Sequence, residues 1–377
     1  MHERGEPVVI VGAGLIGLGI AYELARRGAS VRVIDAHEPG RAASWAGAGM
    51  LAPYTEAHPS ADFEAFCVSS LALYPEFVAD LRARSGVDAR LALDGILEAA
   101  YDSPAQDRLR AQVESRLARG IPARWLDRDE LQRFEPALGR TARGAAFSPS
   151  EGHVDNRRLG RALRGACDAL GVRIDENTGP VALEADARRV LGMRHPRGFV
   201  PAGAVVNAAG AWAGSIEGLP PHAVLPVAPV KGQMLALAMS SNFIRRVMWL
   251  PGAYLVPRDD GRLLVGATVE DAGFDVRVTA AAMRTLLDAA LAALPSLAEL
   301  TIVEMWAGLR PATPDGLPYI GPTSLGGYFV AAGHYRNGIL LTPATARLIA
   351  DILEGRSTGI DAFSPLRAQE APQPAAK

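Results

Sequence analysis

The feature that most constrains this chain is a glycine-rich turn close to its N-terminus. Residues 7–11 form a short apolar run rich in β-branched residues, which is typical of a buried parallel strand. The run leads directly into Gly12, Gly14 and Gly17, which are spaced as G-x-G-x-x-G. Helical spacing follows and ends near Gly28, a residue type that caps helices. This order predicts a strand, a tight turn and a helix.

Each glycine has its own physical reason in a turn that holds a dinucleotide. Gly12 makes the tight turn, Gly14 lets a pyrophosphate approach the backbone, and Gly17 lets the helix pack closely on the sheet. The helix N-terminus then offers N–H donors and partial positive charge to phosphates. A second strand over residues 30–35 ends at Asp35, 23 residues after Gly12. A carboxylate there favours an unphosphorylated ribose. The pattern predicts dinucleotide binding without separating NAD from FAD.

Composition and charge exclude several other classes of protein. The 377 residues suffice for two domains or slightly more, and 39 basic against 41 acidic side chains leave a net charge of −2. No global positive field exists to hold nucleic acid or an anionic membrane. Cys67 and Cys167 form no disulfide framework and lie near no histidine cluster, so we expect no metal site and a reducing, cytoplasmic location. The apolar run 8–21 is too short and too rich in glycine for a membrane span, and residues 1–7 do not resemble a signal peptide.

Three further segments favour FAD over NAD. Residues 40–53 are rich in small residues, which lets the backbone approach a flat ring, and the Ser44 hydroxyl could hold a phosphate. Residues 204–212 are typical of an apolar strand that ends in a small-residue turn. Residues 327–343 indicate a strand, a glycine turn and a helix that begins near residues 337–338. A second helix N-terminus aimed at the ligand suits a reduced, anionic flavin, and NAD enzymes have no need of it.

These segments identify a resemblance. The chain resembles the glycine oxidases of the thiamine-biosynthesis type, within the D-amino-acid oxidase and sarcosine oxidase superfamily of flavoproteins. The likeness extends over most of residues 8–355. It rests on GAGLIG (12–17), RAASWAGAGMLAP (41–53), WAGLRPATPDGLPYIG (306–321) and AAGHYRNGILLTPATA (331–346). It implies an α/β fold, in which a Rossmann-like FAD-binding domain is interleaved with a substrate domain built on an antiparallel β-sheet.

The sequence patterns agree with interleaved domains. Alternating apolar runs between residues 233 and 268 suit an antiparallel sheet, and a helix over residues 280–294 follows. A strand over residues 95–100 and a helix over residues 104–119 belong to the same domain. We expect the FAD-binding domain at residues 1–85, 148–216 and 306–366, the substrate-binding domain at 86–147 and 217–305, and a disordered tail at 367–377.

The resemblance assigns the substrate carboxylate to Arg310, Tyr254 and Arg336. The chemical case for Arg310 is independent, because a guanidinium offers a carboxylate a bidentate, permanently charged match. The alternatives are structural: a salt-bridged arginine at 310, an edge-strand aromatic at 254 and a helix-capping arginine at 336.

Two departures from the family pattern concern the substrate's side chain. Gly252 stands where the best-known glycine oxidase has a histidine, and Val269 stands where it has a methionine. Both should lie around the substrate side chain, in a pocket that also includes Met50. Smaller residues there could admit a substrate larger than glycine, so the preferred amino acid stays open.

The FAD is expected to be bound non-covalently, because neither cysteine lies in a flavin segment. His334 invites the role of a general base, but its family counterpart lies in the flavin-binding turn. The residues that the resemblance places around the cofactor are Gly12, Gly14, Leu15, Ile16, Gly17, Asp35, Ala36, Ala43, Ser44, Ala48, Gly49, Met50, Val181, Gly210, Gly333, His334, Tyr335, Arg336, Asn337, Gly338, Ile339 and Leu340.

The resemblance implies an FAD-dependent oxidative deamination of glycine or another small amino acid. A neutral amine loses hydride to the flavin, the imine hydrolyses to a 2-oxo acid and ammonia, and dioxygen reoxidises the flavin to give hydrogen peroxide. In a thiazole-forming pathway the imine itself would be consumed. The partners are therefore the amino acid and dioxygen, and the family often forms homotetramers, so we expect a homo-oligomer.

Two alternatives stay open. The nearer is a D-amino-acid or N-methyl-amino-acid oxidase or dehydrogenase of the same fold. The other is a flavin-binding partner subunit without catalysis, against which the intact Arg310 and Tyr254 argue.

Overall fold

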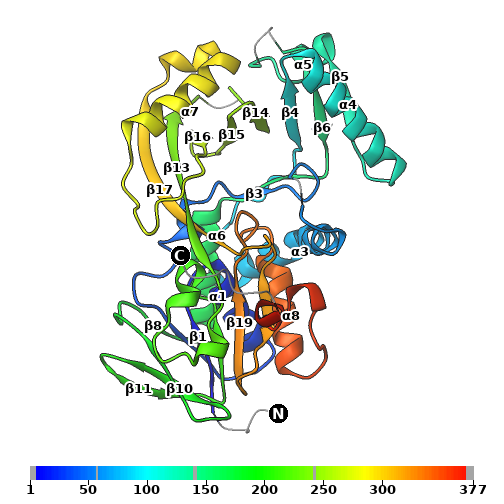
Figure 1. The fold of residues 1–377 in the computed structure, drawn as a ribbon. Helices are drawn as coiled ribbons and strands as arrows, with labels where there is room; N and C mark the ends of the chain where they lie inside the picture. Colours follow the sequence, from blue (N-terminus) through cyan, green and yellow to red (C-terminus); the bar gives the residue numbers. More distant parts are fainter. Residues whose placement is uncertain (1–5, 57, 139–141, 241–242, 371–377) are drawn as a thin grey trace, which may run out of the picture.

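Two large sheets, one in each half of the molecule, organise the structure (Figure 1). The structure is a computed structural model, and it describes residues 6–56, 58–138, 142–240 and 243–370. A six-stranded sheet lies in the lower half of Figure 1 and an eight-stranded sheet in the upper half. The chain crosses between the halves several times, so each sheet is assembled from segments that lie far apart in the sequence.

The six-stranded sheet is parallel except at one edge, where β18 runs antiparallel to β19. Its strands, in spatial order, are β18 (Tyr319–Pro322), β19 (Tyr328–Ala332), β12 (Ala204–Asn207), β1 (Val8–Val11), β2 (Val31–Ile34) and β8 (Arg173–Asp175).

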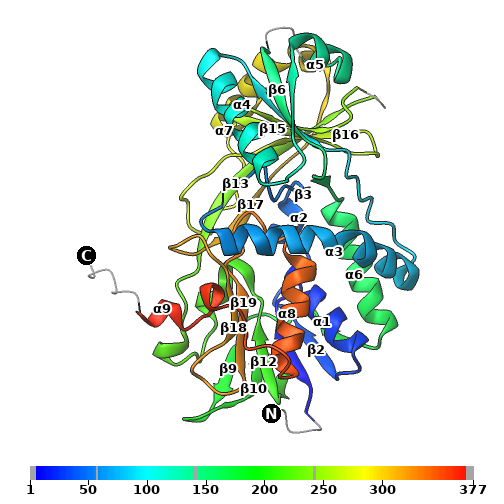
Figure 2. The same ribbon diagram turned by 90° about the vertical axis from the view of Figure 1, so that its right-hand side faces the viewer.

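Both faces of this sheet are covered. Helices pack on one face, and Figure 2 shows three of them beside one another with the fourth crossing above them: α1 (Leu15–Arg26), α6 (Asn156–Ala169), α8 (Thr342–Leu353) and α3 (Ala61–Ser85). The other face carries a small antiparallel sheet of β9 (Ala182–Ala185), β10 (Val190–His195) and β11 (Gly198–Pro201).

Side-chain alternation along β1 explains why this strand is apolar throughout. Val8 and Ile10 join the hydrophobic cluster under the helices, whereas Val9 and Val11 join the cluster under the small sheet. Successive side chains of a strand point to opposite faces. A strand that is buried on both faces therefore needs a continuous apolar run.

The eight-stranded sheet is antiparallel between all neighbours except β14 and β4. Its strands, in spatial order, are β17 (Ile302–Ala312), β13 (Ala228–Ala238), β16 (Arg262–Gly266), β15 (Ala253–Pro257), β14 (Val247–Leu250), β4 (Ile96–Ala100), β6 (Gly144–Ser148) and β5 (Arg124–Asp127). The helices packed on it are α4 (Ser103–Ala118), α5 (Arg128–Phe134) and α7 (Ala280–Ala293).

Short elements complete the described chain. They are α2 (Ala43–Ala46), the paired strands β3 (Met50–Leu51) and β7 (Gly152–His153), the 3₁₀ turns η1 (Gly210–Ser215), η2 (Pro221–Ala223), η3 (Pro295–Glu299) and η4 (Asp361–Phe363), and α9 (Arg367–Glu370). No helix among the described residues is long and apolar enough to cross a membrane.

The predicted fold class is confirmed: a largely parallel sheet is interleaved with a unit built on a mostly antiparallel sheet. The exact domain boundaries stay a prediction. One expected helix start was wrong, because α8 begins at Thr342 and not near residues 337–338. Pro343 in the first turn favours this start. The residues before it form turns, and Tyr335 there has a left-handed φ of 48°.

The predicted disordered tail began too early. Residues 367–370 form α9, and the Arg367 guanidinium donates hydrogen bonds to the Asp315 carboxylate at 2.8 Å and to the Leu317 carbonyl at 2.6 Å. These contacts tie the short helix to the turn before β18. The remaining residues of the predicted tail, 371–377, lie outside the described part of the chain.

Gly17 has a packing role that can be tested by substitution. A Cβ at Gly17 would lie 1.8 Å from the Gly12 carbonyl oxygen, so any side chain must push α1 away from β1. We expect Gly17→Ala to lower the stability of the FAD-free protein by at least about 1–3 kcal/mol, read as a drop in Tm. Gly160→Ala is the control, because the nearest atom to that helical Cβ is 3.8 Å away. An FAD-free Gly17→Ala protein that melts with the wild type would contradict the packing role.

Candidate functional site

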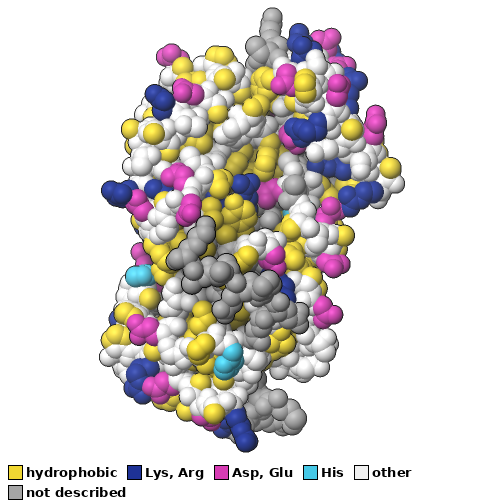
Figure 3. All heavy atoms as spheres, viewed as in Figure 1, with side chains coloured by type: hydrophobic (Ala, Val, Ile, Leu, Met, Phe, Trp, Pro, Cys, Tyr) yellow, Lys and Arg dark blue, Asp and Glu magenta, His cyan; other side chains and the backbone are white. Residues whose placement is uncertain are grey.

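A cavity of about 990 Å³ lies where the two halves meet. Its wall combines the turn before α1, the segment around α2 and the turn before α8 with side chains from β15 and β17. Figure 3 shows hydrophobic side chains gathered in the hollow of the upper half. The predicted site residues that line the cavity are Gly12, Gly14, Leu15, Ile16, Asp35, Ala36, Ala43, Ser44, Ala48, Gly49, Met50, Val181, Gly210, Gly252, Tyr254, Arg310, His334, Tyr335, Arg336, Asn337, Gly338 and Ile339.

Three predicted cofactor residues lie behind the cavity wall and not on it. Gly17 serves the packing of α1. Gly333 has a left-handed φ of 80°, and a Cβ there would lie 2.4 Å from Thr313 Cγ2. Leu340 is buried, and its carbonyl accepts a hydrogen bond from the Ser70 hydroxyl at 2.6 Å. These residues shape the backbone that lines the cavity.

The expectation for Val269 differs from the structure. Its side chain is 54% exposed, and it does not line the cavity. The residues on either side explain the difference. The Thr268 hydroxyl accepts a hydrogen bond from the Gln233 backbone N–H, and the Glu270 carboxylate accepts one from the Gln233 side-chain amide. Alternation along an extended backbone then turns Val269 away from them. Of the two departures from the family pattern, only Gly252 borders the cavity.

One end of the cavity has the features of a phosphate cradle. At Gly14, an added Cβ would meet only the Ser44 hydroxyl, at 3.2 Å, so this space is open toward the cavity. The Ser44 Oγ accepts a hydrogen bond from the Leu15 N–H at 2.9 Å. The first-turn N–H groups of a helix have no acceptors within the helix, and they are available to an anion.

Asp35 has a structural role as well as a place in the cavity wall. Its Oδ2 accepts the Ala13 N–H at 2.7 Å, and its Oδ1 accepts the His37 N–H at 2.9 Å. Burial raises the pKa of the carboxyl, while these two hydrogen bonds oppose the shift. The carboxylate therefore holds the glycine turn in place. Its hydrogen bond to a ribose stays a prediction.

Three side chains that were not predicted as site residues donate hydrogen bonds to backbone carbonyls of the small-residue segment, residues 40–53. The Asn156 amide donates to the Ser44 carbonyl at 2.7 Å, the Trp306 indole to the Ala46 carbonyl at 2.9 Å, and Arg258 Nη2 to the Ala48 carbonyl at 2.8 Å.

Arg258 keeps its charge in this buried place. The side chain is only 4% exposed, and desolvation lowers the pKa of its guanidinium to about 10. It is therefore still protonated at neutral pH, and the backbone it binds is held firmly against the cavity.

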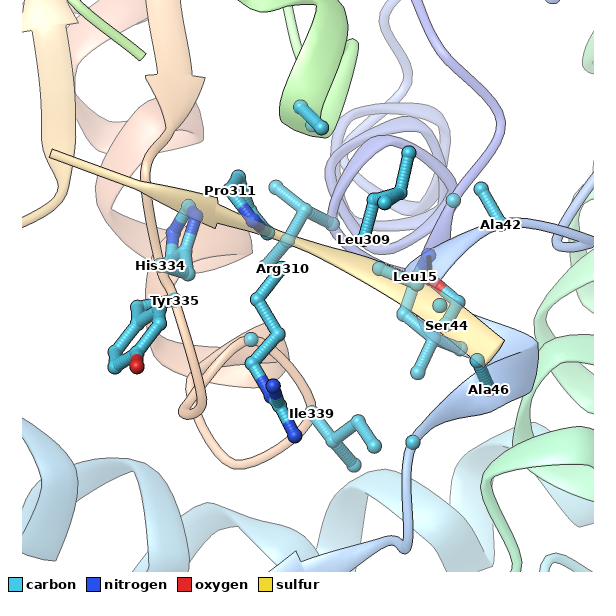
Figure 4. A pocket seen from close by; sticks show the side chains of 18 of the residues that line it. Leu15, Ala42, Ser44, Ala46, Leu309, Arg310, Pro311, His334, Tyr335 and Ile339 are labelled. Carbon is cyan, nitrogen blue, oxygen red and sulfur yellow. Dashed lines mark hydrogen bonds between the residues drawn. The ribbon is translucent and has the colours of Figure 1, made fainter. Parts of the chain in front are cut away.

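Arg310 presents a charge without a counter-ion to the other end of the cavity. Its Nη1 donates to the backbone carbonyls of Thr268 at 3.1 Å and Lys231 at 3.3 Å. A Cβ at Gly232 would lie 2.3 Å from Arg310 Nη2, so only glycine leaves room there. No carboxylate of the described residues lies within 4 Å of this guanidinium. Figure 4 shows it extending from β17 between the turn that carries His334 and the segment that carries Ser44.

Two further predicted residues share this end. Tyr254 is partly buried beside Arg310; burial raises the pKa of the phenol, and the nearby guanidinium opposes the shift. The Arg336 guanidinium lies 5.3 Å from the centre of the Tyr335 ring, and no described carboxylate pairs with it. A cavity with two unpaired guanidinium groups and a phenol suits a small carboxylate.

His334 is held behind these residues. Its Nε2 lies 3.1 Å from the Thr345 hydroxyl, and its side chain is 3% exposed. Burial lowers the pKa of the imidazole to about 3, which keeps the ring neutral. This setting does not favour a general base.

Glu56 is a cavity residue that sequence reasoning missed. It lies between two recognisable segments, three residues after Pro53, and only the folded chain brings it to the same cavity as Arg310 and Arg336. Burial raises the pKa of its carboxyl to about 7, and both guanidinium groups oppose the shift. Its position shortly after the small-residue segment was the one available signal in the sequence.

Comparisons with known proteins agree with this geometry. Residues 7–352 match the DAO family, described as FAD dependent oxidoreductase. The chain is 37% identical to a glycine oxidase of Pseudomonas aeruginosa, over 94% of this chain and 97% of that protein. It is 38% identical to the bifunctional protein ThiO/ThiG of Trichormus variabilis over 92% of this chain, and it spans about half (52%) of that relative's length.

The fold also matches solved structures. A crystal structure of glycine oxidase from Geobacillus kaustophilus superposes with a TM-score of 0.90 at 36% sequence identity. The match covers 96% of this chain and 98% of that one.

The cradle at Gly14 allows a direct test. A Cβ there would meet the Ser44 hydroxyl and no backbone atom within 4 Å outside residues 13–15 and the α1 helix, so a valine would place its side chain in the proposed phosphate space. We therefore expect Gly14→Val to fold and to purify without flavin colour. The measurement is flavin absorbance per protein together with Tm. Ala111→Val, at an exposed position of α4 that does not line the cavity, should stay yellow. A Gly14→Val protein with the flavin content of the wild type would show that the turn is not the phosphate site.

Proposed function

Because the chain belongs to the DAO family of FAD-dependent oxidoreductases, we propose that it oxidises glycine or another small amino acid. The observation that carries the proposal is a pair of guanidinium groups, Arg310 and Arg336, that form no ion pair with any described carboxylate. They lie beside Tyr254 in the cavity that also holds the phosphate cradle. Two relatives that match along nearly their whole length, from Pseudomonas aeruginosa and Pseudomonas putida, are glycine oxidases, which supports the same substrate class.

The residues of the chain fit FAD and a small substrate at once. The cradle at Gly14 and the backbone around α2 would hold the cofactor. When bound, FAD supplies a two-electron oxidant that accepts hydride from the substrate's α-carbon. Arg310 and Tyr254 would bind the substrate carboxylate and so fix the position of the α-carbon, as in a near-attack geometry. Where the apolar part of the wall excludes water, the charge pair would be stronger.

The products follow from the chemistry of the substrate. Loss of hydride from an amine gives an imine, which hydrolyses to a 2-oxo acid and ammonia; for glycine the acid is glyoxylate. Dioxygen is the proposed final electron acceptor, and hydrogen peroxide is the second product. We also propose that the imine serves thiazole formation, which the relative named ThiO/ThiG supports.

The size of the substrate is open. Gly252 borders the cavity with a left-handed φ of 80°, and a Cβ there would lie 3.4 Å from the Ala289 Cβ. D-amino acids and N-methyl amino acids of small size stay alternative substrates. A homotetrameric state and a cytoplasmic location stay predictions, the first of them open to light scattering on the purified protein.

The test of the proposed function is direct. Yellow protein is mixed without oxygen with glycine, sarcosine and small D- and L-amino acids, and the loss of flavin absorbance is followed. Rapid loss with one of them supports the proposal and names the substrate. A protein that no amino acid bleaches would instead be the flavin-binding subunit without catalysis. Repeating the assay with dioxygen or an artificial acceptor distinguishes an oxidase from a dehydrogenase.

Arg310 gives the sharpest mutational prediction. Removing one partner of a desolvated charge pair costs about 3–5 kcal/mol, so Arg310→Ala should lose about 10²–10⁴ in kcat/KM. Arg310→Lys keeps the charge but loses the planar fork, so it should also lose activity. Both variants should keep FAD, because the Arg310 guanidinium bonds to the Lys231 and Thr268 carbonyls at the proposed substrate end.

Two controls separate carboxylate binding from general damage. Amines without a carboxylate should be poor substrates of the wild type and lose little more in either variant. Arg347→Ala removes an exposed arginine of α8 and should behave as wild type. If Arg310→Ala oxidises its best amino acid within a few-fold of wild type, the carboxylate binds elsewhere, and Arg336 is the next candidate.

A further inference from the structure

We infer that Glu56 binds the substrate's ammonium group and accepts its proton, so that the site takes the zwitterion that predominates in solution. The inference rests on the proposed function and deepens it, because it adds a base to a site that otherwise only binds a carboxylate. It concerns a residue of this chain that lines the same cavity as Arg310 and Arg336.

Charges of opposite sign line the cavity without pairing. Glu56 carries a negative charge and the two arginines carry positive charges, yet within the described ranges no ion pair of 4 Å or less joins Glu56 to either of them. Opposite charges that face one cavity and do not meet leave room for a ligand between them. A ligand that matches this arrangement carries a carboxylate at one end and a cation at the other, as an amino acid does.

Hydrogen bonds fix the backbone just before Glu56. The Glu151 carboxylate is fully buried and accepts the N–H groups of Tyr54 at 2.5 Å and Thr55 at 2.9 Å. It also accepts a hydrogen bond from the Thr55 hydroxyl. From the other side, Arg116 donates to the Tyr54 carbonyl and to the Ser148 hydroxyl. These hydrogen bonds hold the backbone that leads into Glu56.

The charged and titratable groups around Glu56 come from five elements. They are Arg336 in the turn before α8, Arg310 on β17, Tyr254 on β15, Glu151 between β6 and β7, and Cys67 on α3. Burial and the Glu151 charge favour the protonated carboxyl, whereas the two arginines favour the carboxylate. The resulting pKa of about 7 places Glu56 where it can take up a proton near neutral pH.

An N–H bond of the ammonium group breaks, an O–H bond forms on the Glu56 carboxylate, and the substrate nitrogen is left with a lone pair. That lone pair can form the C=N bond as hydride leaves the α-carbon. An ammonium group has no lone pair and could not do so, which is why a base in the site matters.

The first test compares pH profiles of anaerobic flavin reduction for wild type and Glu56→Gln. Wild type should lose activity below about pH 7, where Glu56 becomes protonated, and the variant should depend on the small fraction of amino acid that is already neutral. That fraction rises tenfold per pH unit toward the amine pKa of roughly 10. We expect the variant to be on the order of 10²–10³-fold slower near pH 7 and within a few-fold of wild type near pH 10.

Two matched variants accompany this test. Glu76→Gln removes the same charge from the exposed side of α3 and should follow wild type at every pH. Glu56→Asp keeps the carboxylate but shortens its reach, and it should restore the wild-type shape of the profile at a lower rate. A Glu56→Gln to wild-type ratio that does not change with pH would overturn the inference.

The second test needs no turnover. 2-Aminoisobutyrate has a carboxylate and an ammonium group but no α-hydrogen, and trimethylacetate replaces its ammonium by a methyl group of similar size. Binding of each is read from the shift of the flavin spectrum. Glu56→Gln should weaken 2-aminoisobutyrate about tenfold or more and leave trimethylacetate unchanged or tighter. Equal weakening of both ligands, or of neither, would contradict a role at the ammonium group.

The outcomes separate this inference from the proposed function. If no amino acid reduces the wild-type flavin, the proposed function fails and this inference fails with it. If wild type is reduced and Glu56→Gln matches it across the pH range, only the role of Glu56 is wrong. Should neither ligand bind to wild type, the pH profile alone decides.

Discussion

The close approach of α1 to β1 is the constraint on which the rest of this structure depends. At Gly17 a single added carbon would lie 1.8 Å from the Gly12 carbonyl, and at Gly12 it would lie 2.5 Å from the Ala208 carbonyl. These contacts set the helix N-terminus beside the ends of β1 and β12. The cavity begins at that point, and segments that are distant in the sequence, such as residues 307–311 and 334–339, form its other walls.

The far end of the cavity is organised by charge. Placing a guanidinium where water is scarce is costly unless hydrogen bonds compensate. For Arg310 the carbonyls of Lys231 and Thr268 supply that compensation, which requires β13, the segment after β16 and β17 to meet at one place. The two carbonyls accept hydrogen bonds from Nη1, but they carry no negative charge that would neutralise the guanidinium. The eight-stranded sheet thus holds a cation at the cavity, where we propose that it binds the substrate carboxylate.

The sequence predicted the parts that depend on local spacing. The glycine turn, the α/β class and the shared location of Arg310, Tyr254 and Arg336 could be predicted from short motifs and from the resemblance they carry. Features set by contacts between distant segments could not. Val269 points outward because its neighbours bond to β13, and Glu56 enters the cavity because Glu151 clamps the loop before it. Neither contact leaves a periodic signal in the chain.

A crystal structure of the FAD-bound protein with 2-aminoisobutyrate, which has no α-hydrogen to lose, would show directly what the cavity binds. We expect its carboxylate within hydrogen-bond distance of the Arg310 guanidinium and the Tyr254 hydroxyl. We expect its amino nitrogen on the side of Glu56 and its α-carbon against the flavin ring. A ligand bound with its carboxylate away from Arg310, or outside the cavity, would contradict the central claim that this cavity is an amino-acid site.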